Sequence, residues 1–433
     1  MNKEYNYPDF LRLIFSDILG ELRSIEVGID RLDDFLEYGA MIDGSSVPGY
    51  ASVNESDLLL LSPSATPTLQ PWDPSAAFLM CRVHEIDGKP HPRDPRTILD
   101  KMILNASSKG FQLMIGSELE FFTIRKRQDD SLEPCDSGGY FSSRPMDPEL
   151  EFRRDIIRTL NAVGIQTTSH HHEVARGQHE VGLQYAPVSI AADNILLARQ
   201  IIMEMAALRG IGVTFMPKPF SDQNGSGLHL HQSMWEIDGS RNLFSSKGNG
   251  GLSQLAINYI AGLLEHASSY IAFLAPTVNS YKRLVPGYEA PTRIAWGYRN
   301  RSTMIRIPYF NGSEKAARIE LRCPDTMISP HLGIAGILAA GLDGIKRDLE
   351  PGQPITTNLY KTISDVKSLP SSLRESLDLL DKSHLMRKEL GDSAVDAFVS
   401  LRMREWNDYV ETIEDPHSSI ITSWEHERYL RVN

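Results

Sequence analysis

The sequence predicts an α+β protein with a small N-terminal domain and a larger second domain. The chain has 433 residues, which is enough for more than one domain. Runs rich in β-branched and aromatic residues, typical of strands, are interspersed with longer helical stretches. The segment 93–96, Arg-Asp-Pro-Arg, is the expected junction. Residues 1–95 are therefore expected to form one domain and residues 96–433 the other.

The composition argues against several classes of partner. The net charge is −12 without a dense run of Lys and Arg, which disfavours nucleic acid or an anionic membrane as the main partner. The three cysteines are far apart and form neither a disulfide framework nor a metal motif, so we expect a reducing cytoplasm. The N-terminus has no signal-peptide core, and the apolar stretch 332–342 is too short to span a bilayer.

The first domain is expected to contain strands at 11–16, 21–29 and 77–84, and another apolar run at 58–61. The turn between the first two strands falls at 17–20. Asp30 is the expected cap of a helix that runs to about Tyr38. Polar loops are expected at 41–46 and 54–57.

The second domain is expected to begin with a helix from residue 98, capped by Thr97. Further helices are expected at 148–163, 191–208 and 252–274, and most of the chain from residue 329 is also expected to be helical. Expected strands cover 115–122, a segment ending at 216, and 303–307. The irregular segments 128–148 and 276–291 are expected to be functional loops.

The stretch 115–122, Ile-Gly-Ser-Glu-Leu-Glu-Phe-Phe, carries the first chemical signal. Side chains alternate along a strand, so Glu118 and Glu120 share one face while Leu119 and Phe121 take the other. Neighbouring carboxylates repel each other and resist burial unless solvent or a cation lies beside them. A solvated sheet face and a cation site are both open interpretations of this pair.

A second acidic pair lies in the segment 170–181, His-His-His-Glu-Val-Ala-Arg-Gly-Gln-His-Glu-Val. A two-residue hairpin turn at Arg176-Gly177 would place Glu173 directly opposite Glu180, and a longer turn would still leave the two carboxylates close together. Opposed carboxylates destabilise a hairpin unless something cationic lies between them. Three consecutive histidines cannot all face one way on a strand, so a zinc site made of all three is not expected.

Two further segments offer candidate ligands. A glycine-rich turn at 224–227 precedes His229 and His231, which alternation places on one strand face as ligands or as structural side chains. Glu289 lies between Gly287 and Pro291, as a carboxylate on a lid would.

Arginines gather between residues 299 and 322, together with Glu320. The guanidinium group suits phosphate and carboxylate recognition, and a salt-bridged surface is the alternative. The candidate metal ligands are Glu118, Glu120, Glu173, Glu180, Glu320 and His229. This oxygen-rich set favours Mg²⁺ or Mn²⁺ over zinc and suffices for two or more ions. Metals beside arginines suit phosphoryl transfer, although no Walker loop or kinase signature is present.

These motifs resemble those of the glutamine synthetase family, type I, in its short form (alpha subclass). The resemblance spans nearly the whole chain in the same order. The matching pieces are D-G-S-S at 43–46, N-E-S-D at 54–57, G-S-E-L-E-F-F, G-G-Y-F at 138–141, H-H-E-V-A-x-G-Q-H-E, N-G-S-G-x-H-x-H, N-S-Y-K-R-L-V-P-G-Y-E-A-P, R-N-R-S-x-x-I-R-I-P and R-I-E-L-R-x-P-D.

The resemblance implies a fold and an assembly. It implies a β-grasp-like N-terminal domain and a catalytic domain with a curved antiparallel sheet flanked by helices. It also implies a homododecamer of two hexameric rings, in which each active site lies between neighbouring subunits. Asp43 and Asp57 of one subunit would then serve the site of the next.

Residue roles follow from the matched motifs. One metal would be held by Glu120, Glu173 and Glu180, and another by Glu118, His229 and Glu320. Glutamate would be bound by Arg283, Arg322, Asn224 and Gly225. ATP would be bound by Arg301, Arg306, Arg318, His231, Ser233 and Lys315. The ammonium site would consist of Asp43, Ser46, Tyr140 and Glu289. Asp43, Glu289, Arg301 and Arg322 would be catalytic.

The implied reaction is the ATP-dependent ligation of ammonia to the γ-carboxylate of L-glutamate through γ-glutamyl phosphate. The implied cofactors are two or three Mg²⁺ or Mn²⁺ ions per site, with ATP as co-substrate. One alternative is a γ-glutamyl ligase for another amine; retention of Asp43, Tyr140 and Glu289 favours ammonia. The other is a catalytically silent regulatory homologue, which would have lost ligands that this chain retains.

The short form also bears on regulation. Tyr360 lies where the longer form is adenylylated, but the segment that accompanies that modification is absent, so modification is not expected. Small regulatory proteins are possible partners of the assembly.

Overall fold

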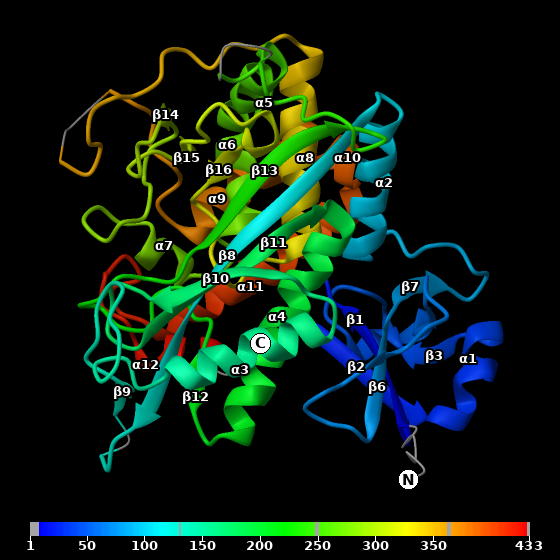
Figure 1. The fold of residues 1–433 in the computed structure, drawn as a ribbon. Coiled ribbons are helices and arrows are strands. Elements are labelled where there is room, and N and C mark those ends of the chain that lie inside the picture. The colour runs from blue at the N-terminus through cyan, green and yellow to red at the C-terminus, as the bar shows by residue number, and fades with distance from the viewer. Residues whose placement is uncertain (1–7, 130, 247–250, 362–364, 431–433) are drawn as a thin grey trace.

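The computed structural model describes residues 8–129, 131–246, 251–361 and 365–430. Figure 1 shows the α+β architecture that the sequence predicts: a small N-terminal unit lies beside a larger unit built on one long sheet. No helix among the described residues combines the length and the apolar character needed to cross a membrane. All three cysteines are free thiols.

The small unit contains two sheets and one α-helix. Its elements are β1 (Phe10–Ser16), β2 (Leu22–Gly28), α1 (Leu32–Tyr38), β3 (Ala40–Asp43), β4 (Asp57–Leu61), β5 (Thr68–Leu69), β6 (Ala76–Met80) and β7 (Arg82–Glu85). One sheet has the order β2-β1-β6-β5, with β1 and β6 parallel, and the other has the order β3-β4-β7. Buried Leu11, Leu13, Leu58 and Leu60 contribute to the core between them.

Two expectations for the small unit are wrong in detail. The predicted strand 77–84 is two strands in different sheets, because the chain changes sheets at Cys81, whose amide donates to Ile14 O. Asp30 does not cap α1. The chain already turns at the 3₁₀ segment Ile29–Arg31, so the helix begins at Leu32 without a side-chain cap.

The larger unit is organised around one sheet in which nine strands are described. The order is β10-β11-β8-β13-β16-β15-β14, with β9 and β12 also paired to β8. The strands are β8 (Phe111–Lys126), β9 (Leu132–Pro134), β10 (Thr167–His172), β11 (Gln178–Pro187), β12 (Gly212–Thr214), β13 (Leu228–Glu236), β14 (Trp296–Tyr298), β15 (Ile305–Ile307) and β16 (Ile319–Leu321). The β14–β15 pair is parallel and the other pairs are antiparallel.

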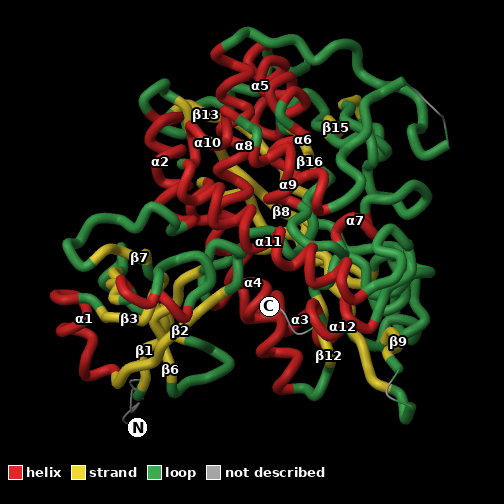
Figure 2. Tube along the Cα trace, turned by 180° about the vertical axis from the view of Figure 1, so that it is seen from behind, coloured by secondary structure: helices red, strands yellow, loops and turns green. Residues whose placement is uncertain are grey.

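Helices cover one face of this sheet, as the view from behind in Figure 2 shows. They include α2 and α4, which contact β8, and α8, which packs on α2, α4 and α5. The helices are α2 (Pro95–Ser107), α3 (Leu150–Ala162), α4 (Val188–Leu208), α5 (Gln254–Glu265), α6 (Ala267–Leu274), α7 (Ser280–Arg283), α8 (Pro330–Lys346), α9 (Leu373–Asp381), α10 (His384–Leu390), α11 (Asp392–Thr412) and α12 (Ser423–Tyr429).

Two predicted helix boundaries are also wrong. The cap of α2 is Asp94 rather than Thr97: the Asp94 carboxylate accepts the Thr97 amide, and Pro95 occupies the first helical position. The predicted helix 252–274 is interrupted at His266, which leaves helical geometry and separates α5 from α6.

Strand β8 gives the sheet its two chemically different faces. Leu113, Ile115, Leu119 and Phe121 are buried in the core. Because side chains alternate, Glu118 and Glu120 lie on the opposite face, as the sequence predicts.

Candidate active site

Cross-strand pairing brings the candidate ligands into one row across the sheet. Glu180 on β11 lies opposite Glu120 on β8, and Glu118 lies opposite His229 on β13. His231 then lies opposite Glu320 on β16, and Glu320 opposite Arg306 on β15. Directly opposed residues point to the same face, so five strands supply side chains to one site.

The hairpin register differs from the prediction. Arg176 and Gly177 do lie within a turn, in which the Gln178 amide donates to Ala175 O. However, Glu173 N donates to Gln178 O, so the loop is longer and Glu180 lies opposite His171 instead of Glu173. The shift is two residues, which leaves each side chain on its expected face. Both carboxylates still approach His171, at 3.5 Å for Glu173 and 3.1 Å for Glu180.

One side of the row, the acidic half, consists of Glu120, Glu173, Glu180 and His171. Burial, and then repulsion from Glu173 and Glu180, raises the pKa of Glu120 well above its ordinary value. Burial and the neighbouring Glu180 raise the pKa of Glu173 to about 7. The Glu120 carboxylate accepts from Gln178 Nε2 at 3.0 Å and from the Gly227 amide at 2.8 Å. A bound cation would relieve the remaining repulsion.

The other side, the paired half, consists of Glu118, Glu320, His229, His231, Arg306 and Arg322. Glu118 contacts His229 Nδ1 at 2.8 Å and His231 Nε2 at 2.9 Å. Burial alone would raise its pKa, but the two imidazoles hold it well below the ordinary value. Glu320 is contacted by Arg306 and, at 2.6 Å, by Arg322. Burial would raise the pKa of Glu320, but the charges of Arg322, His229 and His231 outweigh it and lower that pKa to about 2.

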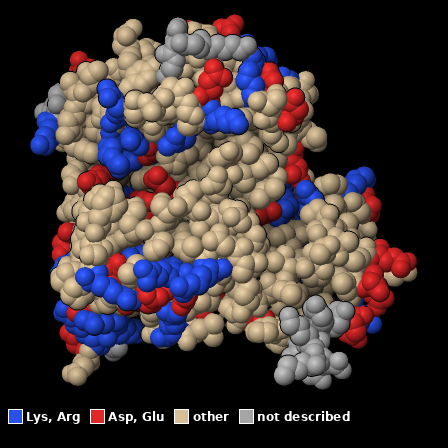
Figure 3. All heavy atoms as spheres, in the orientation of Figure 1, with Lys and Arg blue, Asp and Glu red and all other residues tan. Residues whose placement is uncertain are grey.

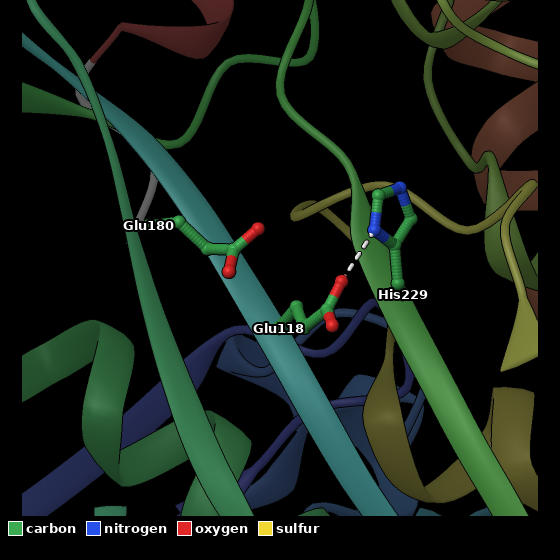
Figure 4. Close-up of side chains that lie close together, drawn as sticks. All are labelled: Glu118, Glu180 and His229. Carbon is green, nitrogen blue, oxygen red and sulfur yellow. Dashed lines mark hydrogen bonds and ion pairs between the residues drawn. The ribbon is translucent and has the colours of Figure 1, made fainter. Parts of the chain in front are cut away.

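Three groups of donor atoms are close enough to share a metal ion. Their members are Glu118, Glu180 and His229; Glu118, His231 and Glu320; and His171, Glu173 and Glu180. Figure 4 shows the first group, whose side chains converge from three adjacent strands. This grouping differs from the predicted division. Glu180 and Glu118 join the two halves, while Glu120 is in none of the groups found among the described residues.

All side chains of the row except His231 line a cavity of about 830 Å³. Arg283, Arg301, Arg306 and Arg322 line the same cavity, and Figure 3 shows acidic and basic side chains around a hollow left of centre. The Nε groups of Arg306 and Arg322 are buried without an acceptor. Arg283 donates to the carbonyl oxygens of Cys323 and Arg322 at 3.0 and 3.2 Å. An anion in the cavity would supply the missing acceptors.

Asn224, Gly225, Tyr140 and Glu289, four further candidate site residues, also line the cavity. Glu289 lies on the loop after α7, and its carboxylate accepts from Asn224 Nδ2 at 3.0 Å. Tyr140 is 47% exposed, and burial followed by the charge of Glu173 raises its pKa. These residues surround the acidic half.

Several predicted site residues do not line this cavity. Asp43 and Ser46 are exposed on the small unit, where Asp43 accepts from Ser45 and Ser46 hydroxyls at 2.6 and 2.7 Å. Asp57 lies opposite Asp43 on β4. His231 contacts Glu118 through Nε2, and its Nδ1 accepts a hydrogen bond from Arg318 Nε at 3.3 Å. Ser233 is buried against Trp235 Nε1, and Lys315 is exposed.

Sequence reasoning missed two residues that organise the acidic half. His171 bridges Glu173 and Glu180, and Gln178 fixes the Glu120 carboxylate. Both lie inside the hairpin motif, but their roles depend on the register. The contact of His171 with Glu180 depends on the pairing of β10 with β11, and that of Gln178 with Glu120 on the pairing of β11 with β8.

The comparisons with known proteins agree with this geometry. The family model "Glutamine synthetase, beta-Grasp domain" matches residues 8–86, and "Glutamine synthetase, catalytic domain" matches residues 92–429. The chain is 40% identical to a "Glutamine synthetase" of Pyrococcus abyssi, with 98% of this chain and 97% of that chain covered. It is also 40% identical to one of Thermus thermophilus, with 97% and 95% covered.

Solved structures show the same likeness. One described as "GmaS/ADP complex-Conformation 1" matches with a TM-score of 0.86 and 31% identity, covering 97% of this chain and 96% of that chain. Another, "Apo GmaS without ligand", matches with a TM-score of 0.85 and 32% identity, covering 98% and 97%. With both family models matched in order and close relatives aligned over nearly the full length, this chain belongs to the glutamine synthetase family.

Proposed function

We propose that this protein ligates ammonia to the γ-carboxylate of glutamate at the expense of ATP. The observation that carries the proposal is a single cavity lined both by buried carboxylates that repel one another and by arginines with unused donors. That arrangement suits a metal-bound polyphosphate, since the acidic half requires cations and the arginines require anions. The family membership of the chain supports the same reaction.

The residues present fit divalent metal ions. Oxygen donors dominate the three ligand groups, which suits Mg²⁺ or Mn²⁺, and the row offers places for two or more ions. Glu173 and Glu180 would hold an ion in the acidic half, with Glu120 beside them, while Glu118 and Glu320 would hold one in the paired half together with His229 or His231. When bound, the ions would neutralise phosphate charge and polarise the transferred group.

The arginines would neutralise and orient the substrates. Arg301 and Arg306 would contact the nucleotide phosphates, and Arg283, Arg322 and the Asn224-Gly225 backbone would hold glutamate. An oxygen of the γ-carboxylate attacks the terminal phosphorus, and ADP leaves. Ammonia then attacks the acyl carbon, phosphate leaves, and glutamine remains after loss of a proton. Arg322 also pairs with Glu320, so its guanidinium is held in place before substrate arrives.

The remaining nucleotide contacts would lie beside the paired half. His231, Arg318, Ser233 and Lys315 are on β13 or close to β16. The relative whose description records ADP shares this fold at 31% identity, which supports a nucleotide site. Arg318 is half-buried, and desolvation lowers its pKa despite the carboxylates of Glu320 and Glu118.

The ammonium site would need a second copy of the chain. Tyr140 and Glu289 line the cavity, whereas Asp43 and Ser46 of the same chain do not. In the proposed dodecamer, a neighbouring subunit would bring Asp43 and Ser46 to this site. Hydrogen bonds from Ser45 and Ser46 hold the pKa of exposed Asp43 below its ordinary value. Burial by the neighbour would raise that pKa and make Asp43 a better proton acceptor.

We also propose residue 95 as the domain boundary. Strand β7 ends at Glu85 and helix α2 begins at Pro95, so the intervening segment joins the two units. A chain beginning at residue 96 should lack the proposed Asp43 and Ser46 contribution.

The test of function is an assay of the purified protein with ATP, Mg²⁺ and glutamate. Addition of ammonium should yield glutamine, ADP and phosphate in equal amounts. Product formation with another amine but not with ammonium would support the alternative ligase. A failure to release phosphate with any amine would support the silent homologue.

A further inference from the structure

Tyr360 lies in the wall of the cavity, where its hydroxyl group faces two loops. Tyr360 Oη lies 2.8 Å from the carbonyl oxygen of Glu289 and 2.9 Å from that of Arg301. The first carbonyl belongs to the proposed lid and the second to an arginine loop that lines the cavity. The hydroxyl therefore lies where the two loops meet.

The lid is the segment 286–291, and its backbone needs support. Glu289 has φ 60°, in the left-handed region that residues other than glycine rarely adopt. Its side chain is held by Asn224, and the ring of Tyr288 lies 3.4 Å from Lys218 Nζ. Both contacts act on side chains. Tyr360 instead holds the lid backbone at the strained residue itself.

Tyr360 also interacts with Arg322. Burial raises the pKa of Tyr360, while Arg322, through charge and hydrogen bonding, opposes that effect. Arg322 in turn donates to Glu320 at 2.6 Å. The charge of Arg322 thus acts on both Glu320 and Tyr360, and the Tyr360 hydroxyl contacts the backbone of Glu289.

We propose that Tyr360 is a positioning residue that fastens the lid over the cavity and links its closed position to Arg322. The inference rests on the proposed function, because a closed lid matters most when an acyl phosphate must be kept from water. Without the hydroxyl, the lid opens more often. Water then attacks γ-glutamyl phosphate, phosphate leaves, and glutamate is regenerated while the ATP has been spent.

The test is Tyr360→Phe, which removes one oxygen atom and keeps the ring. The ratio of ADP formed to glutamine formed should rise from about one to about two or more, because a single lost hydrogen bond is enough to shift the lid equilibrium several-fold. The KM for ammonium should rise about fivefold while kcat changes about twofold or less. Hydrogen exchange at the amides of 287–290 should become about fivefold faster.

The matched control is Tyr309→Phe. Tyr309 is exposed, and its hydroxyl donates to Asn311 Oδ1 at a distance of 2.9 Å. Neither residue lines the cavity. This variant should leave the product ratio, the KM and the lid exchange unchanged. Tyr360→His retains a ring donor and should restore part of the protection of the lid.

Two results would overturn the proposal. In the first, Tyr360→Phe and Tyr309→Phe show the same hydrogen-exchange rate at the lid amides and the same ratio of ADP to glutamine. The other is a uniform loss of kcat and folding stability with an unchanged product ratio, which indicates a purely structural tyrosine. If the wild-type protein makes no glutamine, the proposed function fails, while the exchange comparison still decides whether Tyr360 fastens the lid.

Discussion

The acidic half and the paired half of the cavity bury similar carboxylates in opposite electrostatic settings. In the acidic half, Glu173 and Glu180 share the imidazole of His171 beside the buried Glu120, and the pKa of Glu173 rises to about 7. In the paired half, two carboxylates have two imidazoles and two guanidinium groups, and the pKa of Glu320 falls to about 2. Burial opposes ionisation in both, so the partners decide the outcome. The acidic half depends on added cations, whereas the paired half is already neutralised by the protein.

The largest expected effect is a loss of unfolding free energy when the charge of Glu320 is removed from the paired half. Glu320→Gln leaves Arg306 and Arg322 without a buried counter-charge, so the metal-free protein should lose about 3 kcal/mol of unfolding free energy. Urea unfolding in the presence of a chelator measures this loss. The control is Glu133→Gln, since Glu133 also pairs with two arginines, Arg125 and Arg127, but on the surface. An equal loss of unfolding free energy in the two variants would contradict the claim that burial makes the Glu320 pairs the more important ones.

The second effect tests the dependence of the acidic half on metal. Mg²⁺ at about 100 times its Kd should stabilise the wild-type protein by about 2.7 kcal/mol per ion bound to the folded state alone. Glu173→Gln should reduce this gain, because it removes a donor and the repulsion that the ion relieves. Thermal unfolding with and without Mg²⁺ provides the comparison. An undiminished gain in the variant would place the ion elsewhere.

The third effect concerns pH. Because Glu173 has a pKa of about 7, a proton must leave it when metal binds below that pH. Metal affinity should therefore fall up to about tenfold per pH unit below 7 and level off above it. Glu320 stays ionised throughout this range because its pKa is about 2. Calorimetric titration between pH 6 and pH 8 checks the slope, and a flat profile would be inconsistent with the raised pKa.

The smallest expected effect is a gain in unfolding free energy, whereas the first prediction is a loss. A carboxyl group whose folded-state pKa is raised favours folding only while protonated, and this contribution is lost as pH rises toward 7. Metal-free Glu173→Gln should therefore be about 1 kcal/mol more stable than wild type at pH 8. The difference should shrink toward pH 5. Urea unfolding at the two pH values measures this difference. A variant less stable than wild type at pH 8 would refute the claim that the ionised Glu173 destabilises the metal-free acidic half.

Much of the site could be predicted because strand alternation is a local property. Glu118 and Glu120 share a face of β8 whatever the rest of the chain does. The position of Glu180 relative to Glu173 was not predictable in the same way. It depends on a loop whose extra residues move the register by two, and on the pairing of β11 with β8. Turn composition around Arg176 and Gly177 suggests a hairpin without fixing its length.

The sequence by itself determined which donors are available, which of them share a strand face, and that oxygen ligands dominate. Only the tertiary structure decided that Glu118 contacts two imidazoles while Glu173 approaches one, that Asp43 lies apart from the cavity, and that Tyr360 meets the lid. The physical reason is range. Face and residue type are set within a few positions of the chain, whereas charge state and contact depend on partners that can lie over a hundred residues away, as His229 does from Glu118.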